Sequence, residues 1–470
     1  MKLSDLLSVV GGTLVGEAEF SSIEHDSRRV GKGCLFVCLV GEKADGHSYA
    51  EEACRLGAVA LLVERKLDLP VAQLVVEDCR LALGEVAQAF YGYPGRSLTL
   101  LGVTGTNGKT SVAYLLRTVL EEAGYKAVYV GTLGVVGCGM DRKTSLTTPD
   151  PLELAALMQE MVAVGVQYVT MELSAHAIYW KKLSGLHFKG IILTNLSQDH
   201  LDFFGDMQRY RAVKMSVFDL AHTHLGIVNS DDEMGRLLLR SAGLPLLSYG
   251  LDNPADVFAV RIRENREGVE FVLNAFDVIY RLRTPLHGNF NVYNALAVAT
   301  LSGYLGIDAG AVQRAFAVAR VPGRFDCIEK NGVQFVVDYA HTPDGLQKSM
   351  RACRKLGGRL LVVFGCGGDR DRDKRAKMGR IASRLGDYVI ITSDNPRSED
   401  PLQIAKSVEA GVAYSDSHEV ILDRTLAIRR AAKLAKPGDV VLVAGKGAEE
   451  TVEVNGELLP YSDYAVIEEL

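Results

Sequence analysis

Apolar runs that lead into polar loops recur along this chain, and most of them are followed by an amphipathic helical pattern. Residues 98–103 form one such run, and apolar side chains then recur at helical spacing from Val112 to Leu120. Six further runs are residues 168–171, 190–195, 333–337, 359–364, 388–392 and 439–444. Strands that alternate with helices in this way predict an α/β fold with parallel sheets.

The loop after the first of these runs carries the clearest chemical signal. Gly105, Gly108, Lys109 and Thr110 lie between the predicted strand and the predicted helix. Glycines let backbone N–H groups approach a phosphate, and the helix N-terminus adds positive potential. Lysine can reach the terminal phosphates and threonine can bind Mg²⁺. Although Val103 replaces the first glycine of the usual pattern, this context predicts a nucleoside triphosphate site.

Two Pro-Gly-Arg segments, at residues 94–96 and 322–324, are the candidate linkers. A chain of 470 residues also fits about three domains of ~150 residues each. We expect an N-terminal α/β domain at 1–97, a central P-loop-type ATPase domain with a parallel sheet at 98–323, and a C-terminal Rossmann-like domain at 324–470. Within the central domain, residues 257–283 read as strands around a hairpin turn at 265–268.

Two more predicted strands of the central domain end in groups that can bind a metal ion. Glu172 follows the strand at 168–171, and His200 follows the strand at 190–195. Ligands of open parallel sheets bind at the carboxyl ends of the strands. A surface glutamate and a structural histidine are the alternatives, but the recurrence of this placement favours metal ligands beside a nucleotide.

Composition and charge narrow the class of protein. The formal charge of −6 gives no basic footprint, so we do not expect nucleic acid as a partner. No run of ~18 or more uncharged apolar residues predicts a membrane span, and the N-terminus has no signal-peptide pattern. The eight cysteines include no C-x-x-C pair, which indicates reduced thiols. We expect a cytoplasmic protein that acts as a monomer.

No serine or cysteine is placed as a nucleophile with a paired base. The parts suit phosphoryl transfer to a substrate carboxylate, which gives an acyl phosphate that an amine then attacks. The alternative from the residues alone is a P-loop kinase or NTPase with an appended binding domain.

The chain resembles the Mur ligase family, in particular its MurE type, over essentially its whole length. The resemblance is carried by residues 26–28, 105–110, 147–150, 172–176, 194–202, 210–214, 288–294, 338–344, 365–371, 394–397 and 445–447. It implies an ATP-dependent ligase of peptidoglycan precursor synthesis that adds meso-2,6-diaminopimelate to UDP-N-acetylmuramoyl-L-alanyl-D-glutamate. The alternatives are a ligase of the same superfamily with another amino acid or acceptor, such as L-lysine, and a non-catalytic nucleotide-binding partner.

The resemblance also implies roles for individual residues of the central domain. ATP would bind Gly105, Thr106, Asn107, Gly108, Lys109, Thr110, Ser111, Asn291, Asn294, Arg324, Asp338 and His341. Mg²⁺ would bind Thr110, Glu172, His200 and Lys214, with Lys109 and the last three of these as catalytic residues. Lys214 matches a lysine that is N-carboxylated in the family, although by residue type alone it would be a solvated helix lysine.

The two remaining substrates would occupy separate sites. The resemblance places the sugar nucleotide, which the N-terminal domain would help to bind, at His25, Ser27, Glu42, Lys43, Ala44, Thr147, Thr148, Ser174, Trp180 and Lys182. It places meso-diaminopimelate at Arg370, Asp394, Asn395, Pro396, Arg397, Gly445 and Glu449. Arg370 and Arg397 can pair with the distal carboxylate, which L-lysine lacks, whereas Asn395 and Glu449 can bind the distal ammonium.

Overall fold

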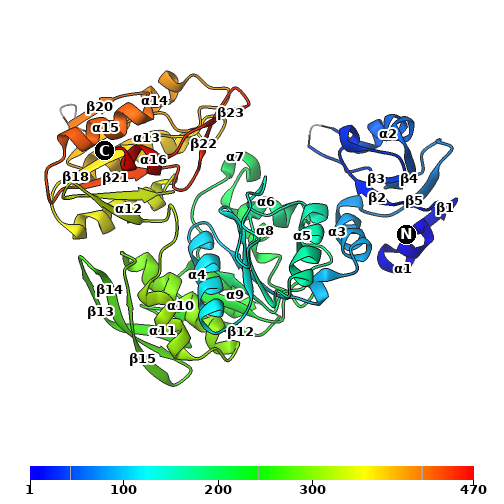
Figure 1. Cartoon of the computed structure of the whole chain (residues 1–470), viewed down its shortest axis with the longest axis horizontal. Coiled ribbons are helices and arrows are strands. Elements are labelled where there is room, and N and C mark those ends of the chain that lie inside the picture. The colour runs from blue at the N-terminus through cyan, green and yellow to red at the C-terminus, as the bar shows by residue number, and fades with distance from the viewer. Residues whose placement is uncertain (43, 242, 414–416) are drawn as a thin grey trace.

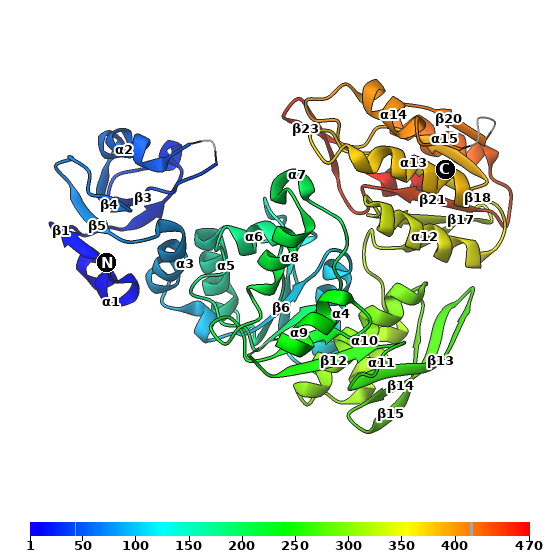
Figure 2. The same ribbon diagram turned by 180° about the vertical axis from the view of Figure 1, so that it is seen from behind.

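The computed structural model describes residues 1–42, 44–241, 243–413 and 417–470, and within these ranges the strands form four sheets. Three larger sheets follow one another along the chain, and the fourth is a short hairpin near the C-terminus. The segment that carries the central sheet lies between the N-terminal and C-terminal regions in both views (Figures 1 and 2). The expected α/β fold with three successive parts is therefore present.

The N-terminal sheet has the order β1-β5-β4-β3-β2 and is parallel except for its edge strand β1. Apolar side chains of β3 and β4 pack against the buried side of the helix that ends this region. The strands are β1 (Thr13–Val15), β2 (Ser22–Glu24), β3 (Cys34–Val37), β4 (Ala58–Val63) and β5 (Ala72–Val75). The helices are η1 (Leu3–Leu6), α1 (Leu7–Val10), η2 (Ser27–Arg29), η3 (Gly46–Tyr49), α2 (Ala50–Leu56), α3 (Cys79–Phe90) and η4 (Pro94–Arg96).

The central sheet has ten strands in the order β15-β14-β13-β12-β11-β10-β6-β9-β7-β8. Its middle is parallel as expected, and both ends add antiparallel strands. The strands are β6 (Thr99–Thr104), β7 (Ala127–Gly131), β8 (Gly134–Val136), β9 (Tyr168–Glu172), β10 (Gly190–Leu193), β11 (Gly226–Asn229), β12 (Leu246–Gly250), β13 (Val257–Asn265), β14 (Gly268–Ala275) and β15 (Val278–Thr284). The hairpin predicted at 265–268 joins β13 to β14.

Helices cover both faces of this sheet. The predicted apolar side of α4, from Val112 to Leu120, is buried with α10 in one core cluster, and α5 packs in a second cluster on the other face. The helices are α4 (Lys109–Glu122), α5 (Pro151–Ala163), α6 (Ala175–Tyr179), α7 (Leu201–Phe204), α8 (Met207–Met215), α9 (Glu233–Ser241), α10 (Asn289–Tyr304) and α11 (Ala309–Ala317).

The C-terminal sheet has the order β16-β17-β21-β18-β19-β20 and is parallel except for its edge strand β16. Four predicted strands appear here within two residues of their expected ends. The strands are β16 (Asp326–Lys330), β17 (Val333–Asp338), β18 (Leu360–Phe364), β19 (Tyr388–Ile391), β20 (His418–Val420), β21 (Val440–Ala444), β22 (Thr451–Val454) and β23 (Glu457–Pro460). The helices are α12 (Pro343–Leu356), α13 (Asp373–Leu385), α14 (Pro401–Glu409), α15 (Arg424–Leu434) and α16 (Asp463–Glu468).

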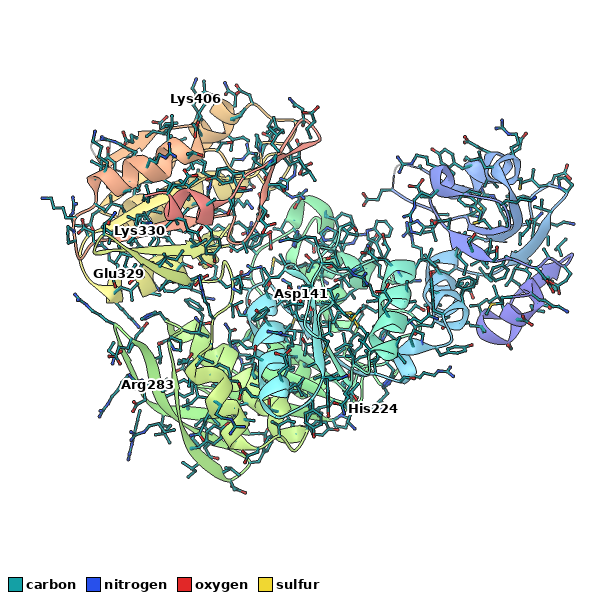
Figure 3. All side chains as sticks on the ribbon, viewed as in Figure 1. Asp141, His224, Arg283, Glu329, Lys330 and Lys406 are labelled. Carbon is teal, nitrogen blue, oxygen red and sulfur yellow. The ribbon has the colours of Figure 1, made fainter. Side chains whose placement is uncertain are left out.

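The strand registers place the predicted functional residues at the carboxyl ends of the parallel strands, along one edge of each sheet. Thr104 at the end of β6 is level with Leu193 of β10, and Glu172 ends the neighbouring strand β9. In the C-terminal sheet Asp338 pairs with Ala444 at the ends of β17 and β21. Arg283 and Lys406, in contrast, lie on the periphery of the molecule (Figure 3). Among the described residues, no helix combines the length and the apolar character that a membrane crossing requires.

Candidate active site

One cavity of about 1090 Å³ is lined by residues of the central and the C-terminal regions. It brings together most of the side chains predicted from the sequence. These are Thr106, Asn107, Gly108, Lys109, Thr110, Ser111, Thr147, Thr148, Glu172, Ser174, Trp180, Lys182, His200, Lys214, Asn294, Arg324, Asp338, His341, Arg370, Asp394, Asn395, Arg397, Gly445 and Glu449.

Within the described ranges, the other predicted residues do not line this cavity. Asn291 donates from Nδ2 to the carbonyl of His287 and accepts from Asn294 Nδ2, so it supports a lining residue. His25 borders a smaller cavity together with Trp180 and Lys182. Among the described residues, the remaining members of this group are Gly105, Ser27, Glu42, Ala44 and Pro396. Lys43 lies outside the described residues.

Residues 105–110, called the phosphate loop below, join β6 to the first turn of α4 as the sequence predicts. Gly105 and Gly108 have φ angles of +141° and +89°, which L side chains rarely adopt. A Cβ at Gly105 would overlap the Thr194 hydroxyl, so this position also needs glycine for space. The Lys109 ammonium donates to the carbonyls of Gly105 and Thr106 at 3.1 and 2.9 Å. The lysine is thereby held over its own loop, where a phosphate would bind.

Lys214 is buried beneath the phosphate loop, with 1% of the residue exposed. Its Nζ donates to the carbonyl of Gly105 at 2.8 Å and lies 3.4 Å from Thr104 Oγ1. Burial, followed by the charge of Lys109, holds the pKa of Lys214 well below its usual range. This side chain is therefore no solvated helix lysine, and its amine is biased toward the neutral form.

Glu172 lies at the floor of the cavity and is fully buried. Its Oε1 accepts from the Tyr129 hydroxyl and from the backbone N–H of Thr132, the latter at 2.9 Å. Among the described residues, the other oxygen, Oε2, has only a long contact of 3.4 Å with Thr132 Oγ1. One carboxylate oxygen is therefore fixed by the protein, and the other remains available to a ligand in the cavity.

Thr110 lies in the first turn of α4, and its hydroxyl accepts from Arg324 Nη2 at 2.7 Å. The Arg324 guanidinium also stacks over the Tyr339 ring, 4.1 Å from its centroid. A second contact between the central and C-terminal regions joins Asn107 Nδ2 to Asp344 Oδ2 at 3.1 Å. The phosphate loop is thus contacted directly by C-terminal residues.

His200 precedes the short helix α7 with a φ of +54°. Its Nε2 lies 3.4 Å from Asp199 Oδ2, and its ring meets that of His176 edge to face at 4.9 Å. Burial lowers the pKa of His200, while the charge of Asp199 opposes this shift. A neutral imidazole is the form that binds metal ions.

The donor set of the cavity fits Mg²⁺ bound together with phosphates. Within the described ranges, no three His, Cys, Asp or Glu side chains converge on one point as a metal site. Mg²⁺ does not need such a cluster, since it commonly binds one or two carboxylates, substrate phosphates and waters. Glu172 Oε2, the Thr110 hydroxyl and His200 all line the cavity beside the phosphate loop.

Two further side chains enter from the C-terminal sheet. Asp338 accepts from the backbone N–H groups of Phe325 and Tyr339 at 3.1 and 2.9 Å, and from the Ser349 hydroxyl. Burial raises the pKa of this carboxyl against the effect of these bonds. His341 Nδ1 lies 2.9 Å from the carbonyl of Tyr339, and burial lowers the pKa of its ring.

At the N-terminal side, the cavity is bounded by the loop before α5, by Ser174 after β9 and by residues that follow α6. Thr148 Oγ1 lies 3.2 Å from Ser174 Oγ and donates to the carbonyl of Glu172. Lys182 is paired with Asp150 at 2.6 Å. The Trp180 ring carries the Arg80 guanidinium at 4.1 Å from its centroid, a contact with the N-terminal region that the sequence did not predict.

The loop after β19 supplies the predicted amino-acid site. Arg397 has a φ of +53°, donates from Nη1 to the carbonyl of Gly368 at 2.8 Å and pairs through Nε with Glu453 at 2.9 Å. Arg370 is exposed, and a Cβ placed on Gly367 would lie close to both arginine side chains. The two guanidinium-bearing side chains therefore border the same part of the cavity.

Asn395 and Glu449 are joined by a hydrogen bond of 3.0 Å. Lys446, which is fully buried, donates to both of these side chains. Sequence reasoning assigned no role to Lys446 or Glu453. The bonds of Lys446 have a physical reason, because burial of an unpaired charge is costly in free energy. The sequence signals at Lys446 were its position between two glycines directly after a strand and its place in the segment 445–447 that carries the family resemblance.

Comparisons with known proteins show which proteins the chain is similar to. Family profiles match three stretches: "Mur ligase family, catalytic domain" at residues 19–91, "Mur ligase middle domain" at 103–302 and "Mur ligase, glutamate ligase domain" at 323–447. The chain is 41% identical to a UDP-N-acetylmuramoyl-L-alanyl-D-glutamate–2,6-diaminopimelate ligase of Syntrophomonas wolfei, over 97% of this chain and 95% of the relative. It is 40% identical to the enzyme of the same name from Geobacillus thermodenitrificans, over 99% and 98%.

Solved structures show the same fold. A structure of a UDP-N-acetylmuramoyl-L-alanyl-D-glutamate–2,6-diaminopimelate ligase covers 96% of this chain and 94% of its own, with 31% identity and a TM-score of 0.69. The MurF ligase of Thermotoga maritima in complex with ADP covers 90% and 93%, with 21% identity and a TM-score of 0.63.

Proposed function

Since the chain belongs to the Mur ligase family, we propose that it joins meso-2,6-diaminopimelate to UDP-N-acetylmuramoyl-L-alanyl-D-glutamate at the expense of ATP. The names of its relatives describe this ligation, and the family resemblance implies that the product is a peptidoglycan precursor. One observation carries the proposal: the phosphate loop and the loop of Asn395 and Arg397 line the same cavity. A nucleotide and an amino acid bound at these loops would meet in one space.

ATP is proposed to lie with its phosphates on residues 105–111. Backbone N–H groups of the loop and the N-terminus of α4 would bind the phosphates, as helix N-termini generally do. The Lys109 ammonium, which now donates to two loop carbonyls, would turn to the transferring phosphoryl group. Asn294, Arg324, Asp338 and His341 are proposed to surround the rest of the nucleotide, with Asn291 behind Asn294.

Mg²⁺ would be held by the Thr110 hydroxyl, Glu172 Oε2, His200 and modified Lys214, and it would neutralise the charge that develops on the phosphates. For Thr110 to bind the ion, its hydroxyl must exchange the bond from Arg324 Nη2 for a metal bond. Released from Thr110, the Arg324 guanidinium would be free to bind the nucleotide.

We propose that the buried amine of Lys214 is carboxylated in the active enzyme. In this reaction the neutral amine attacks CO₂, a new N–C bond forms and a proton is released. The depressed pKa of Lys214 favours the reactive neutral amine. The product is an anion, which can help to hold a divalent cation where an ammonium could not.

The reaction then needs two displacements. The γ-carboxylate oxygen of the D-glutamate attacks the γ-phosphorus of ATP, the bond to ADP breaks, and an acyl phosphate forms. The amine of diaminopimelate attacks the acyl carbon, inorganic phosphate leaves, and the amine loses its proton to give the amide. The protein's part is to hold the carboxylate, the phosphate and the amine within reach of one another.

The sugar nucleotide is proposed to bind between the N-terminal and central regions. Thr147, Thr148, Ser174, Trp180 and Lys182 would form its end in the main cavity. The other end would reach His25, Ser27, Glu42, Lys43 and Ala44 of the N-terminal region. His25 borders the smaller cavity beside Trp180, which supports a path between the two ends.

Diaminopimelate is proposed to place its distal carboxylate at Arg370 and Arg397 and its distal ammonium at Asn395 and Glu449. The neighbouring Asp394, Pro396 and Gly445 would shape the pocket. The carboxylate gains charge-assisted bonds from the guanidinium groups. L-lysine would leave these groups without a partner, which disfavours it.

We place this reaction in the cytoplasm, in a monomer divided at 1–97, 98–323 and 324–470. The eight cysteines include no C-x-x-C pair, and reduced thiols are typical of this compartment. Each proposed domain contains one of the three larger sheets.

Isotope transfer tests the proposed acyl phosphate. The γ-carboxylate of the acceptor is labelled with ¹⁸O, and the enzyme is supplied with Mg·ATP and meso-diaminopimelate. We expect one labelled oxygen in the released phosphate, because phosphate leaves with the oxygen that attacked ATP. Unlabelled phosphate released together with the amide product would contradict this route.

A further inference from the structure

We infer that Glu453 and Lys446 are positioning residues of the amino-acid pocket, and that they set its preference for an amino acid with a second carboxylate. The inference rests on the proposed function. Glu453 belongs to the hairpin β22–β23, and Lys446 to the loop after β21, so both act from outside the loop at 394–397 that they hold.

Glu453 fixes the plane of the Arg397 guanidinium. Its Oε2 accepts from Arg397 Nε at 2.9 Å, while Arg397 Nη1 donates to the carbonyl of Gly368 at 2.8 Å. In the part of the chain that the structure describes, Arg397 Nη2 donates to no protein group. Two of the three guanidinium nitrogens, Nε and Nη1, thus donate to the protein, and Nη2 is left for a ligand carboxylate.

The backbone of the same residues is tied independently of these side chains. The N–H of Arg397 donates to the carbonyl of Glu453 at 3.1 Å, and the N–H of Asn455 donates to the carbonyl of Arg397 at 2.8 Å. Removal of the Glu453 carboxylate therefore leaves the loop attached to the hairpin. A substitution of Glu453 therefore tests the position of the Arg397 guanidinium without detaching the loop.

Lys446 fixes the side chains of Asn395 and Glu449, which would bind the distal ammonium. Its buried Nζ donates to Glu449 Oε2 at 2.7 Å and to Asn395 Oδ1 at 3.1 Å. Asn395 Nδ2 donates to the same Glu449 oxygen at 3.0 Å. Within the described chain, Glu449 Oε1 accepts from no protein donor, so this oxygen is the one left for a ligand ammonium.

This arrangement gives a physical reason for discrimination. An arginine without protein partners could turn into solvent when no carboxylate is bound. L-lysine would then bind with little penalty from an unpaired guanidinium. An arginine held by Glu453 and Gly368 cannot relax in this way, so a ligand without the carboxylate leaves it unpaired. Fixing these long side chains before binding also lowers the entropy cost for the correct ligand.

Steady-state kinetics with meso-diaminopimelate and L-lysine tests the inference, using Glu453→Ala and Glu453→Gln in the full-length enzyme. For Glu453→Ala we expect the KM for meso-diaminopimelate to rise about tenfold, with kcat within about twofold and the KM for ATP unchanged. The preference for meso-diaminopimelate over L-lysine in kcat/KM should fall about tenfold. For Glu453→Gln we expect a KM and a selectivity between those of the unchanged enzyme and of Glu453→Ala, because the amide oxygen can still accept from Arg397 Nε.

Two further variants complete the design. Glu457→Ala removes an exposed glutamate of the same hairpin and should behave as the unchanged enzyme. Lys446→Met should raise the KM for meso-diaminopimelate in the same direction as Glu453→Ala. Unchanged KM and selectivity in Glu453→Ala would overturn the inference, as would equal losses toward ATP and the amino acid. If the enzyme without any substitution does not turn over meso-diaminopimelate, this result would instead overturn the proposed function on which the inference rests.

Discussion

The amine of Lys214 lies 2.8 Å from the carbonyl of Gly105, in a position where an ammonium and a carbamate would have opposite effects. An ammonium would repel a divalent cation beside the phosphates, and a carbamate would attract it. The chemical state of this one side chain therefore decides whether the metal site proposed around Glu172 can form.

We expect Lys214→Ala to lower kcat at least about 100-fold, as removal of one preorganised charge commonly does. Formate or acetate, which can place a carboxylate in the vacated space, should restore part of the activity. Lys214→Arg, which keeps a positive charge and fills the space, serves as the control and should not respond to these acids. Turnover by Lys214→Ala at the level of the unchanged enzyme would remove the carbamate from the mechanism.

Residue type did not predict the burial of Lys214, which would be a solvated lysine on most helices. In the fold it shares a buried side of α8 with Tyr210, one helical turn earlier, and this side faces the phosphate loop. Glu453 and Lys446 escaped prediction for a similar reason: their partners Arg397 and Asn395 are about fifty residues away in sequence. Only the assembled loops bring these pairs within hydrogen-bond distance.

At the scale of elements, the sequence predicted the strands of the parallel sheets closely. Buried parallel strands read as continuous apolar runs, and β6, β9 and β10 begin and end within two residues of their expected limits. The polar loops at their carboxyl ends were predicted with them. The order of the ten-stranded sheet and its antiparallel addition β7–β8 were not, because strand pairing joins segments distant in sequence.

The turn from β6 into α4 depends on glycine at its first position. We expect Gly105→Ala to weaken the binding of Mg·ADP at least about tenfold, because the new Cβ would overlap Thr194 and displace the loop. Isothermal titration calorimetry measures the affinity. Gly124→Ala is the matched control, since Gly124 has a φ of +88° but a Cβ added there would meet no atom within 4 Å. Equal affinity for ADP in Gly105→Ala and the unchanged protein would contradict the proposed phosphate site.

At the scale of the whole molecule, the reaction depends on contacts that join the central and C-terminal domains. Arg324 reaches Thr110, Asn107 reaches Asp344, and Lys355 of α12 pairs with Glu264 of β13 at 2.7 Å. These contacts hold the phosphate loop and the proposed amino-acid pocket around one cavity of about 1090 Å³. The proposed specificity therefore belongs to the assembled molecule, since neither domain contains both the nucleotide site and the amino-acid site.

The most direct test of this account is phosphate release from Mg·ATP with UDP-N-acetylmuramoyl-L-alanyl-D-glutamate, comparing meso-diaminopimelate with L-lysine. We predict release with meso-diaminopimelate and a kcat/KM for L-lysine at least about 100-fold lower, because L-lysine leaves the arginines of the pocket unpaired. Equal rates, or a preference for L-lysine, would contradict the assignment of the pocket. Release with neither amino acid, from protein that still binds ADP, would contradict the ligase reaction itself.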